Sequence, residues 1–323
     1  MAPVVQLLAC KPTGDPMLTR TTVKRRSLRS RFLSWFLRRR FKPKLLRPDF
    51  DPARFRKTLD RDMGKNPIAS NVDVEPVQLE GINGEWLIPT TCSSRRVVLY
   101  SHGGGYLFGS PLSYRAFTSR LAVACDARVF VLDYRLAPEH PFPAAADDVI
   151  AAYRYLLNEH DAADIVLAGD SAGAGLSLSL LVQIRNAGLP MPAATVLMSP
   201  YADLAVTGES ADKNSATCAM FSGDGIRRAA ATYLDGAPAT DARASPLYAE
   251  YAGFPPMLIY VSDNEVLRDD GIRVAERAAA ADVPTDLRIW RGQPHVWPLF
   301  VPLLPEATTV IREIGDYIQR QPS

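Results

Sequence analysis

The sequence predicts an α/β protein in which helices cover both faces of a mostly parallel central sheet. From about residue 72 onward, short β-rich apolar runs alternate with longer segments of helical pattern. The apolar runs are continuous, which is typical of strands that are buried on both faces. Of the 323 residues, 47% are hydrophobic and 22% are charged, so the composition is that of an ordinary folded chain and excludes disorder throughout.

Each expected element follows from one of these patterns. Five apolar runs predict strands: Val97–Tyr100, Val129–Leu132, Ile165–Ala168, Thr195–Met198 and Met257–Val261. A shorter strand-like run covers Asp286–Trp290, and helices are expected at about 144–158, 172–187, 269–281 and 306–320. Residues 204–235 contain no strand pattern and are expected to form a helical excursion over the sheet edge.

The N-terminal segment is chemically distinct from the rest of the chain. Residues 1–61 hold 17 Lys and Arg against 4 Asp and Glu, whereas the remainder holds 20 against 31. Leu28, Phe32, Trp35 and Phe36 follow the spacing that places side chains on one helical face. Such a basic helix either packs on the acidic body or lies on an anionic membrane surface, and the charge of the body favours packing. Nucleic-acid binding is not expected, because a basic stretch without a recognised fold is weak evidence for it.

The remaining composition argues against a metal site, a disulfide framework and secretion. The four cysteines, Cys10, Cys92, Cys125 and Cys218, are widely spaced and form no CxxC pair, so reduced thiols are expected, without a metal signature or a disulfide framework. No apolar run approaches the ~20 residues that cross a bilayer, and the first residues lack a basic region of a signal peptide. A cytoplasmic protein is therefore predicted, with peripheral membrane attachment left open.

A strand, a sharp turn and a helix surround Ser171. The predicted strand ending at Ala168 runs into Gly169–Gly173, which reads G-x-S-x-G, and an apolar helix follows. At such an elbow the serine backbone is strained and its hydroxyl projects clear of the sheet. Ser171 is therefore the candidate nucleophile.

A serine nucleophile needs a base, which in this arrangement follows the serine in the chain. His102, His140 and His160 precede Ser171, so elimination leaves His295 as the candidate base. An acid that supports the imidazole must lie between residues 171 and 295, near the end of a strand. Asp263 and Glu265 both qualify, and the local sequence does not choose between them.

The third requirement is a set of backbone N–H groups that stabilise the oxyanion of the transition state. The predicted strand Val97–Tyr100 leads into Ser101, His102 and three glycines, Gly103–Gly105. Successive glycines allow the backbone to approach a substrate closely, as in the HGGG loops of lipases and esterases. The two common phosphate-binding glycine patterns are missing from this loop. Acyl transfer is therefore favoured over phosphate binding.

With these motifs the chain resembles the hormone-sensitive-lipase-like carboxylesterases of the α/β-hydrolase superfamily over about residues 95–300. The resemblance includes the stretches Asp133–His140, Ser199–Asp203 and Ser245–Leu247. It implies an α/β-hydrolase fold and hydrolysis of short- to medium-chain carboxylic esters, a small-molecule substrate, without a cofactor. It also implies a catalytic domain at 71–323, with a helical cap built from residues 1–70 and from an insertion at about 204–235. A homodimer remains open.

The resemblance assigns further roles to individual residues. Alignment with the family's sequences places Glu265, rather than Asp263, at the position of the triad acid. The same resemblance implies that Gly103, Gly104 and Ala172 donate the oxyanion-hole N–H groups. His102 and His140 become structural loop residues. Trp297 stands where relatives carry a Phe, so its larger ring is expected either to narrow or to reshape the pocket. The first 25 residues match nothing in the family and are expected to be disordered.

Two alternatives remain at this point. A non-catalytic small-ligand receptor can share the fold, although a receptor has no need of His295. Lactone or amide hydrolysis would use the same residues as ester hydrolysis.

Overall fold

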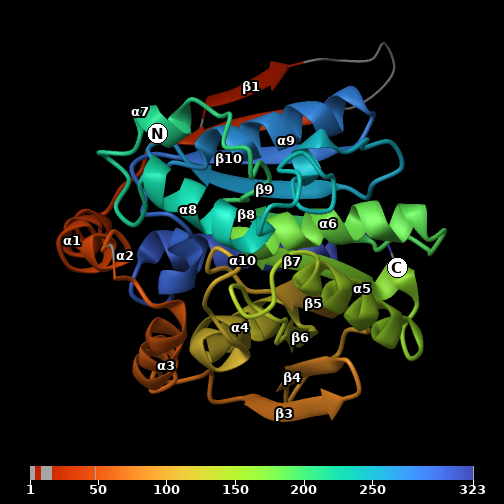
Figure 1. Ribbon diagram of the computed structural model, residues 1–323. Coiled ribbons are helices and arrows are strands. Elements are labelled where there is room, and N and C mark those ends of the chain that lie inside the picture. The colour runs from red at the N-terminus through yellow and green to blue at the C-terminus, as the bar shows by residue number, and fades with distance from the viewer. Residues whose placement is uncertain (1–3, 9–16, 48, 323) are drawn as a thin grey trace.

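The computed structural model describes residues 4–8, 17–47 and 49–322, and ten strands of this part of the chain form one sheet flanked by helices (Figure 1). The strand order is β1-β2-β10-β9-β8-β7-β5-β6-β4-β3. All neighbouring pairs from β2 to β6 in that order are parallel, and the pairs involving β1, β3 and β4 are antiparallel. The strand bounds are β1 Val4–Leu8, β2 Leu18–Val23, β3 Val72–Leu79, β4 Ile82–Pro89, β5 Val97–Ser101, β6 Arg128–Leu132, β7 Ile165–Asp170, β8 Ala194–Met198, β9 Met257–Ser262 and β10 Thr285–Trp290.

The helices include the four that the sequence pattern predicts, each within one or two residues of the expected bounds. The α-helices are α1 Leu28–Phe36, α2 Lys42–Leu45, α3 Pro52–Met63, α4 Pro111–Cys125, α5 Ala144–Leu157, α6 Ala172–Asn186, α7 Ser210–Lys213, α8 Gly223–Leu234, α9 Arg268–Ala280 and α10 Pro305–Gln319. A π-helical stretch, Leu37–Phe41, joins α1 to α2, and short 3-10 helices cover Ala162–Asp164, Pro246–Tyr248 and Trp297–Phe300.

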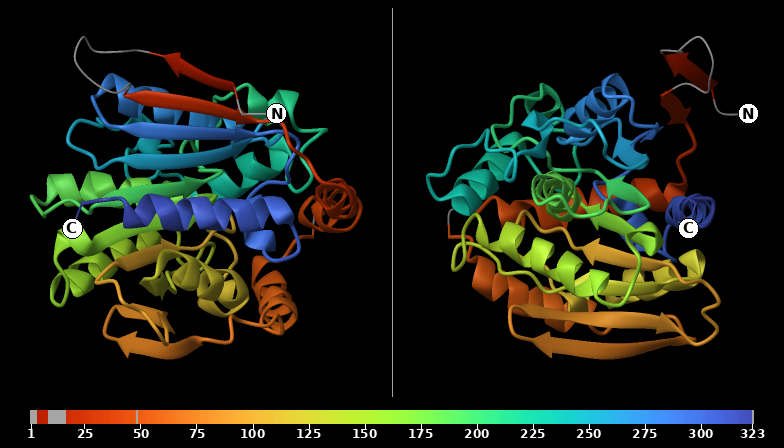
Figure 2. Two further views of the ribbon diagram at one scale, coloured as in Figure 1. Left: turned by 180° about the vertical axis from the view of Figure 1, so that it is seen from behind. Right: turned by 90° about the vertical axis from the view of Figure 1, so that its right-hand side faces the viewer.

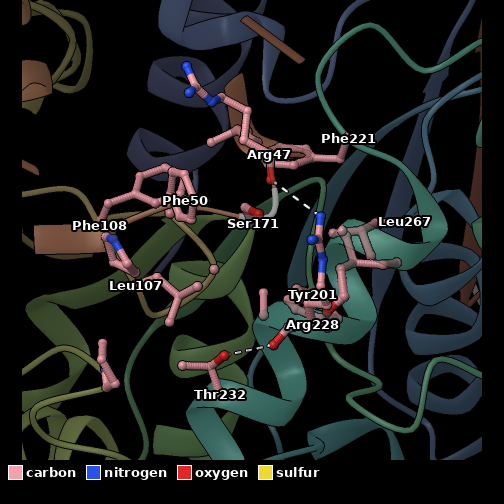
Figure 3. A pocket seen from close by; sticks show the side chains of 18 residues that line it. Arg47, Phe50, Leu107, Phe108, Ser171, Tyr201, Phe221, Arg228, Thr232 and Leu267 are labelled. Atoms are coloured by element: carbon pink, nitrogen blue, oxygen red, sulfur yellow. Dashed lines mark hydrogen bonds between the residues drawn. The ribbon is translucent and has the colours of Figure 1, made fainter. Parts of the chain in front are cut away.

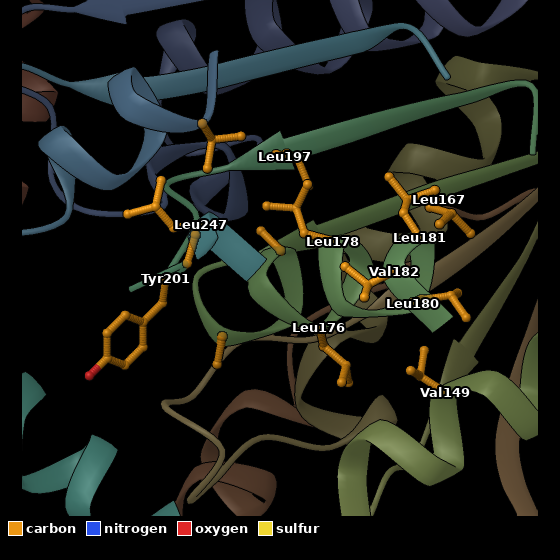
Figure 4. Packing of buried hydrophobic residues seen from close by; sticks show 14 of the residues in the cluster. Val149, Leu167, Leu176, Leu178, Leu180, Leu181, Val182, Leu197, Tyr201 and Leu247 are labelled. Carbon is orange, nitrogen blue, oxygen red and sulfur yellow. The ribbon is translucent and has the colours of Figure 1, made fainter. Parts of the chain in front are cut away.

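Two apolar layers hold the helices to the sheet, one on each face. Side chains alternate between the layers along a strand: Val97 and Leu99 of β5 belong to the layer that also contains residues of α5, α6 and α9, whereas Val98 and Tyr100 belong to the layer that contains residues of α4 and α10. Figure 4 shows leucines of α6, among them Leu178 and Leu181, beneath strands β7 and β8. Figure 2 shows α10 lying across the opposite face. The predicted α/β architecture is therefore confirmed.

The N-terminal segment departs from the sequence-based expectation. Instead of being disordered, Leu18–Val23 forms β2, which pairs in parallel with β10, and β1 pairs with β2. Leu18 and Thr21 of β2 are buried. Residues 1–70 are thus not helical throughout. The mixed polar pattern of this strand, LTRTTV, conceals it, because only two of its six residues, Leu18 and Thr21, are buried.

Helix α1 lies on the body, but through a different face from the one its large apolar residues suggest. The buried residues of this segment are Ser30, Leu33, Ser34 and Leu37. The large apolar residues Leu28, Phe32, Trp35 and Phe36 are exposed instead. The Ser30 hydroxyl donates to Gln293 Oε1 at 2.7 Å, and the small serines allow the helix to approach the body closely. The packed face therefore combines two leucines of the apolar core with a hydrogen bond to a residue distant in sequence.

The N-terminal helices and the 204–235 segment meet. The ring of Phe41 contacts that of Phe221, with centroids 6.5 Å apart. The Lys42 ammonium is buried and donates to the carbonyl oxygens of Ser215, at 2.5 Å, and Cys218, at 3.0 Å.

In the described ranges no helix has the length and apolar character needed to cross a membrane.

Candidate active site

The candidate nucleophile, Ser171, occupies a sharp turn between β7 and α6. Its backbone has φ +52° and ψ −120°, a conformation that is strained for a residue with a side chain. The turn packs so tightly on the neighbouring strand that a Cβ atom on Gly173 would lie 1.9 Å from the carbonyl oxygen of Ser101. The glycine spacing around Ser171 is therefore a steric requirement of the turn.

Three of the predicted site residues come together at the carboxyl ends of parallel strands. Ser171 Oγ lies 2.9 Å from His295 Nε2, and His295 Nδ1 lies 2.5 Å from Glu265 Oε2. These residues follow β7, β10 and β9, and such loops are where open α/β sheets bind ligands. His295 and Glu265 are almost fully buried, so their hydrogen bond is shielded from water. The ring of Phe221 stands edge-on to the imidazole at 5.1 Å.

The two candidate acids have different partners. Glu265 Oε1 accepts the N–H of Ser262 at 2.7 Å, which leaves Oε2 directed at His295. Asp263 Oδ1 instead accepts the N–H of Gly292 at 2.7 Å. Asp263 thereby ties the end of β9 to the loop that carries His295. The geometry brings Glu265, not Asp263, to the imidazole.

The glycine loop places one predicted oxyanion donor away from the site. The N–H of Gly103 donates to Asp170 Oδ1 at 2.9 Å and to the Tyr114 hydroxyl at 3.0 Å, so Gly103 does not fit its expected role. Gly104 and Gly105 line the pocket beside Ser171, and both have positive φ, +120° and +63°. A Cβ atom on Gly104 would lie 1.8 Å from the carbonyl oxygen of Phe108. Three consecutive glycines in the sequence did not reveal which N–H groups face the pocket.

Sequence reasoning missed the residue that anchors this loop, Asp170, which directly precedes the nucleophile. Its carboxylate accepts hydrogen bonds from Tyr100 at 2.7 Å, from Tyr114 at 3.0 Å and from Gly103. Burial raises the pKa of Asp170 to about 6, although these hydrogen bonds act in the opposite direction. In the sequence, the only indication of this role is that Asp170 lies within the G-x-S-x-G motif, next to Ser171.

A cavity of about 270 Å³ opens beside Ser171 (Figure 3). Most of its lining residues come from three parts of the chain, which are the N-terminal segment, the glycine loop with the residues directly after it, and the 204–235 segment. Figure 3 shows Phe50 and Phe108 on one side of Ser171 and Phe221 and Leu267 on the other. Arg228 donates to the carbonyl oxygen of Leu45 at 3.4 Å and so links two of these parts across the cavity. The lining is mostly apolar.

The other residues that the sequence singled out are not part of the hydrogen-bonded series of Ser171, His295 and Glu265. His102 is buried with Nδ1 2.8 Å from the Gly103 oxygen, and burial lowers its pKa to about 4. His140 is exposed. Trp297 does not reshape the pocket: it is fully buried against Trp290 and Tyr260 in the apolar layer on the far side of the sheet.

The cysteines that the structure describes form no disulfide. Cys92, Cys125 and Cys218 are free thiols, and Cys10 lies outside the described residues. Within residues 4–8, 17–47 and 49–322, no three His, Cys, Asp or Glu side chains are grouped so that they could hold a metal ion.

Comparison with known proteins places this geometry in a family. A family model described as alpha/beta hydrolase fold matches residues 98–299, which include Ser171, Glu265 and His295. The chain belongs to the alpha/beta hydrolase family. This alpha/beta hydrolase is 40% identical over 253 residues to an acetyl-hydrolase of Streptomyces hygroscopicus, with 77% of the chain and 84% of the relative covered. It is 34% identical over 268 residues to an esterase of Acinetobacter venetianus, with 82% and 88% covered.

A solved structure gives the same result in three dimensions. The crystal structure of an esterase from the bacterial hormone-sensitive lipase family superposes with a TM-score of 0.86 at 38% identity, and the match covers 92% of this chain and 99% of the other. The predicted resemblance to hormone-sensitive-lipase-like hydrolases is confirmed.

Proposed function

We propose that this alpha/beta hydrolase is a serine carboxylesterase that hydrolyses short- to medium-chain carboxylic esters through an acyl-enzyme intermediate. The observation that carries the proposal is the continuous hydrogen-bonded series from Ser171 through His295 to Glu265. The names of its relatives, esterase and acetyl-hydrolase, support the same reaction class.

In this mechanism His295 acts first as a base and then as an acid. Ser171 Oγ attacks the ester carbonyl carbon and passes its proton to Nε2, and the imidazolium then protonates the departing alcohol. Glu265 accepts the Nδ1–H hydrogen bond, which holds the imidazole in the correct tautomer and stabilises its positive charge. Water repeats the sequence on the acyl-enzyme and releases the carboxylic acid.

The oxyanion that forms during each attack needs backbone donors near Ser171. We assign this role to Gly104, Gly105 and Ala172, with Gly105 in place of Gly103. Gly104 and Gly105 line the pocket, and Ala172 begins α6, where first-turn N–H groups have no partner within the helix. Each such donor lowers the barrier by about 3 kcal/mol.

The cavity supports a small, apolar substrate. Its volume of about 270 Å³ lies just below the range of ~300–1,000 Å³ in which drug-sized ligands bind. The N-terminal helices and the 204–235 segment supply most of its outer wall, so in this proposal they act as the cap that selects the ester. Phe50, Phe108 and Phe221 would contact the apolar parts of the substrate.

A chain-length series of p-nitrophenyl esters tests both the reaction and the substrate class. We expect kcat/KM to be highest between acetate and hexanoate and to fall for decanoate and longer esters. A steady rise up to palmitate would contradict the assigned chain length without affecting the reaction class.

A fluorophosphonate probe tests the nucleophile itself. We expect it to label the wild-type protein, and Ser171→Ala to abolish both labelling and ester turnover. Ser177→Ala is the matched control and should retain both, because Ser177 is a buried serine of the following helix, α6, whose hydroxyl donates to the Gly173 carbonyl oxygen. Turnover at the wild-type rate by Ser171→Ala would end the proposal, and an unlabelled wild type would favour a receptor.

A further inference from the structure

Helix α1 carries four large apolar side chains that the fold leaves in solvent. Leu28, Phe32, Trp35 and Phe36 are between 45% and 78% exposed, and we call them the apolar stripe. The rings of Phe32 and Trp35 contact each other, with centroids 5.7 Å apart. The opposite face of the helix already packs on the body, so the apolar stripe is not needed to hold α1 in place. Contiguous exposed apolar residues of this kind mark an interaction surface.

Cations surround the apolar stripe. Arg29 and Arg31 lie between its members, and Arg38, Arg39 and Arg40 follow it in the next helical turn; all five side chains are exposed. Between residues 16 and 48 the sequence has twelve Lys and Arg and neither Asp nor Glu. The partner of this surface must therefore combine an apolar region with negative charge.

Charge distinguishes between two such partners. A second copy of this chain that docked through the same face would bring the arginines of both copies together, which like-charge repulsion opposes. An anionic lipid surface offers acyl chains to Leu28, Phe32 and Trp35 and phosphates to the flanking arginines. We propose that α1 docks on an anionic lipid surface, with the apolar stripe in the interface and its arginines on the lipid headgroups.

Docking of α1 on a lipid surface would bring that surface close to the pocket. Helical structure is continuous from Leu28 to Leu45, and Leu45 lines the cavity beside Ser171. In Figure 1, α1 and α2 lie side by side at the outer edge of the molecule, and Figure 2 shows α1 at the same edge from behind. An enzyme held in this way would draw lipid-dissolved esters from the surface on which it sits.

Co-sedimentation of the full-length protein with vesicles measures the docking directly and does not depend on catalytic activity. With vesicles of equal parts phosphatidylglycerol and phosphatidylcholine we expect binding that added salt weakens, and with phosphatidylcholine alone much less. Phe32→Ser combined with Trp35→Ser should reduce the partition coefficient about tenfold or more. Arg29→Glu combined with Arg31→Glu should reduce it about tenfold on the anionic vesicles only.

Two control substitutions match these changes elsewhere on the surface. Leu79→Ser alters an exposed apolar residue on the edge strand β3, and Arg154→Glu reverses an exposed charge on α5. Both controls should bind vesicles as the wild type does. Because all altered side chains are exposed, thermal unfolding midpoints should remain close to that of the wild type, which separates loss of docking from loss of folding.

Tryptophan fluorescence provides an independent test. Trp35 is 54% exposed, whereas Trp86, Trp290 and Trp297 are each at most 4% exposed, so a blue shift on adding anionic vesicles reports Trp35. Trp35→Phe should keep most of the binding and lose the shift. Absence of vesicle binding, or binding that the stripe and arginine variants leave unchanged, would overturn the proposal. So would a dimer in size-exclusion chromatography that the Phe32/Trp35 variant dissociates while vesicles bind neither form.

Discussion

The hydroxyl of Ser30 donates a hydrogen bond of 2.7 Å to the side-chain oxygen of Gln293, across 263 residues of sequence. Ser30 lies on the buried face of α1, and Gln293 is two residues before His295 in the loop after β10. The carbonyl oxygen of Gln293 also accepts a hydrogen bond from Ser262 at 2.8 Å. The N-terminal helix is therefore fastened directly to the loop that presents the imidazole.

This contact predicts that Ser30 positions His295. Ser30→Ala should lower kcat about threefold to tenfold with little change in KM, and should cost about 1–2 kcal/mol of the free energy of unfolding, because a buried acceptor loses its donor. Ser34→Ala is the matched control: Ser34 is buried on the same helix face but bonds only Arg26 and the Ser30 carbonyl. Steady-state kinetics on p-nitrophenyl butyrate measure both variants. If Ser30→Ala and Ser34→Ala lowered kcat equally, the role of Ser30 would be purely structural.

The two acidic residues after β9 should differ strongly in their effect on the reaction. Glu265→Gln is expected to lower kcat about 10²-fold to 10⁴-fold, because the amide no longer holds the imidazole in the required tautomer or balances its charge. Asp263→Asn keeps an oxygen that can accept from Gly292, so kcat should fall less than about tenfold. If the Asp263 variant lost more activity than the Glu265 variant, the acid role would pass to Asp263.

The anchor of the glycine loop makes a third prediction. The Tyr114 hydroxyl donates to Asp170 Oδ2 and accepts from the N–H of Gly103. Tyr114→Phe should therefore loosen the loop and lower kcat about fivefold to tenfold, less than the about hundredfold expected for loss of a whole oxyanion donor. Tyr100→Phe removes a hydroxyl that bonds the same carboxylate without touching Gly103, and should change kcat less. Measured kcat values in the opposite order would count against the assigned anchor.

Local pattern was sufficient for the parts of this protein that the backbone and neighbouring residues determine. Continuous apolar runs predicted the central strands, and the helices after β6, β7, β9 and β10 begin and end close to their predicted residues. Ser171 and His295 could be chosen because the chemistry requires their residue types in a fixed chain order. The residues alone left Glu265 and Asp263 open, since only the bond from Ser262 to Glu265 Oε1 directs that side chain at His295.

Partners distant in sequence determine the parts that were predicted wrongly. Nothing within α1 indicates that Ser30 and Ser34 are buried while Phe32 and Trp35 are exposed, because Gln293 supplies the reason. Similarly, the N–H of Gly103 turns away from the pocket because the carboxylate of Asp170, 67 residues later, accepts its hydrogen bond. A long-range polar contact leaves no periodic signal for sequence analysis to find.

Asp270, on α9, makes a prediction about the pH dependence of stability. Burial, and then repulsion by Asp203, raises its pKa from 3.8 to about 8, although N–H groups of Ala202 and Asp203 and the charge of Arg273 act against the rise. The folded state thus binds this proton more tightly than the unfolded state does. The resulting stabilisation is complete below about pH 4 and is lost as the pH rises towards 8, by at most about 1.4 kcal/mol per pH unit.

The variant Asp270→Asn removes this titration and keeps one oxygen that can accept from the two N–H groups. Urea unfolding of both proteins at several values between about pH 5 and pH 8 should show the variant gaining stability relative to the wild type as the pH rises. The difference between the two proteins cancels the titration of groups that both share. A difference that stayed constant over this range would mean that the Asp270 carboxyl loses its proton at the same pH in the folded and unfolded chains, and that burial does not govern its charge.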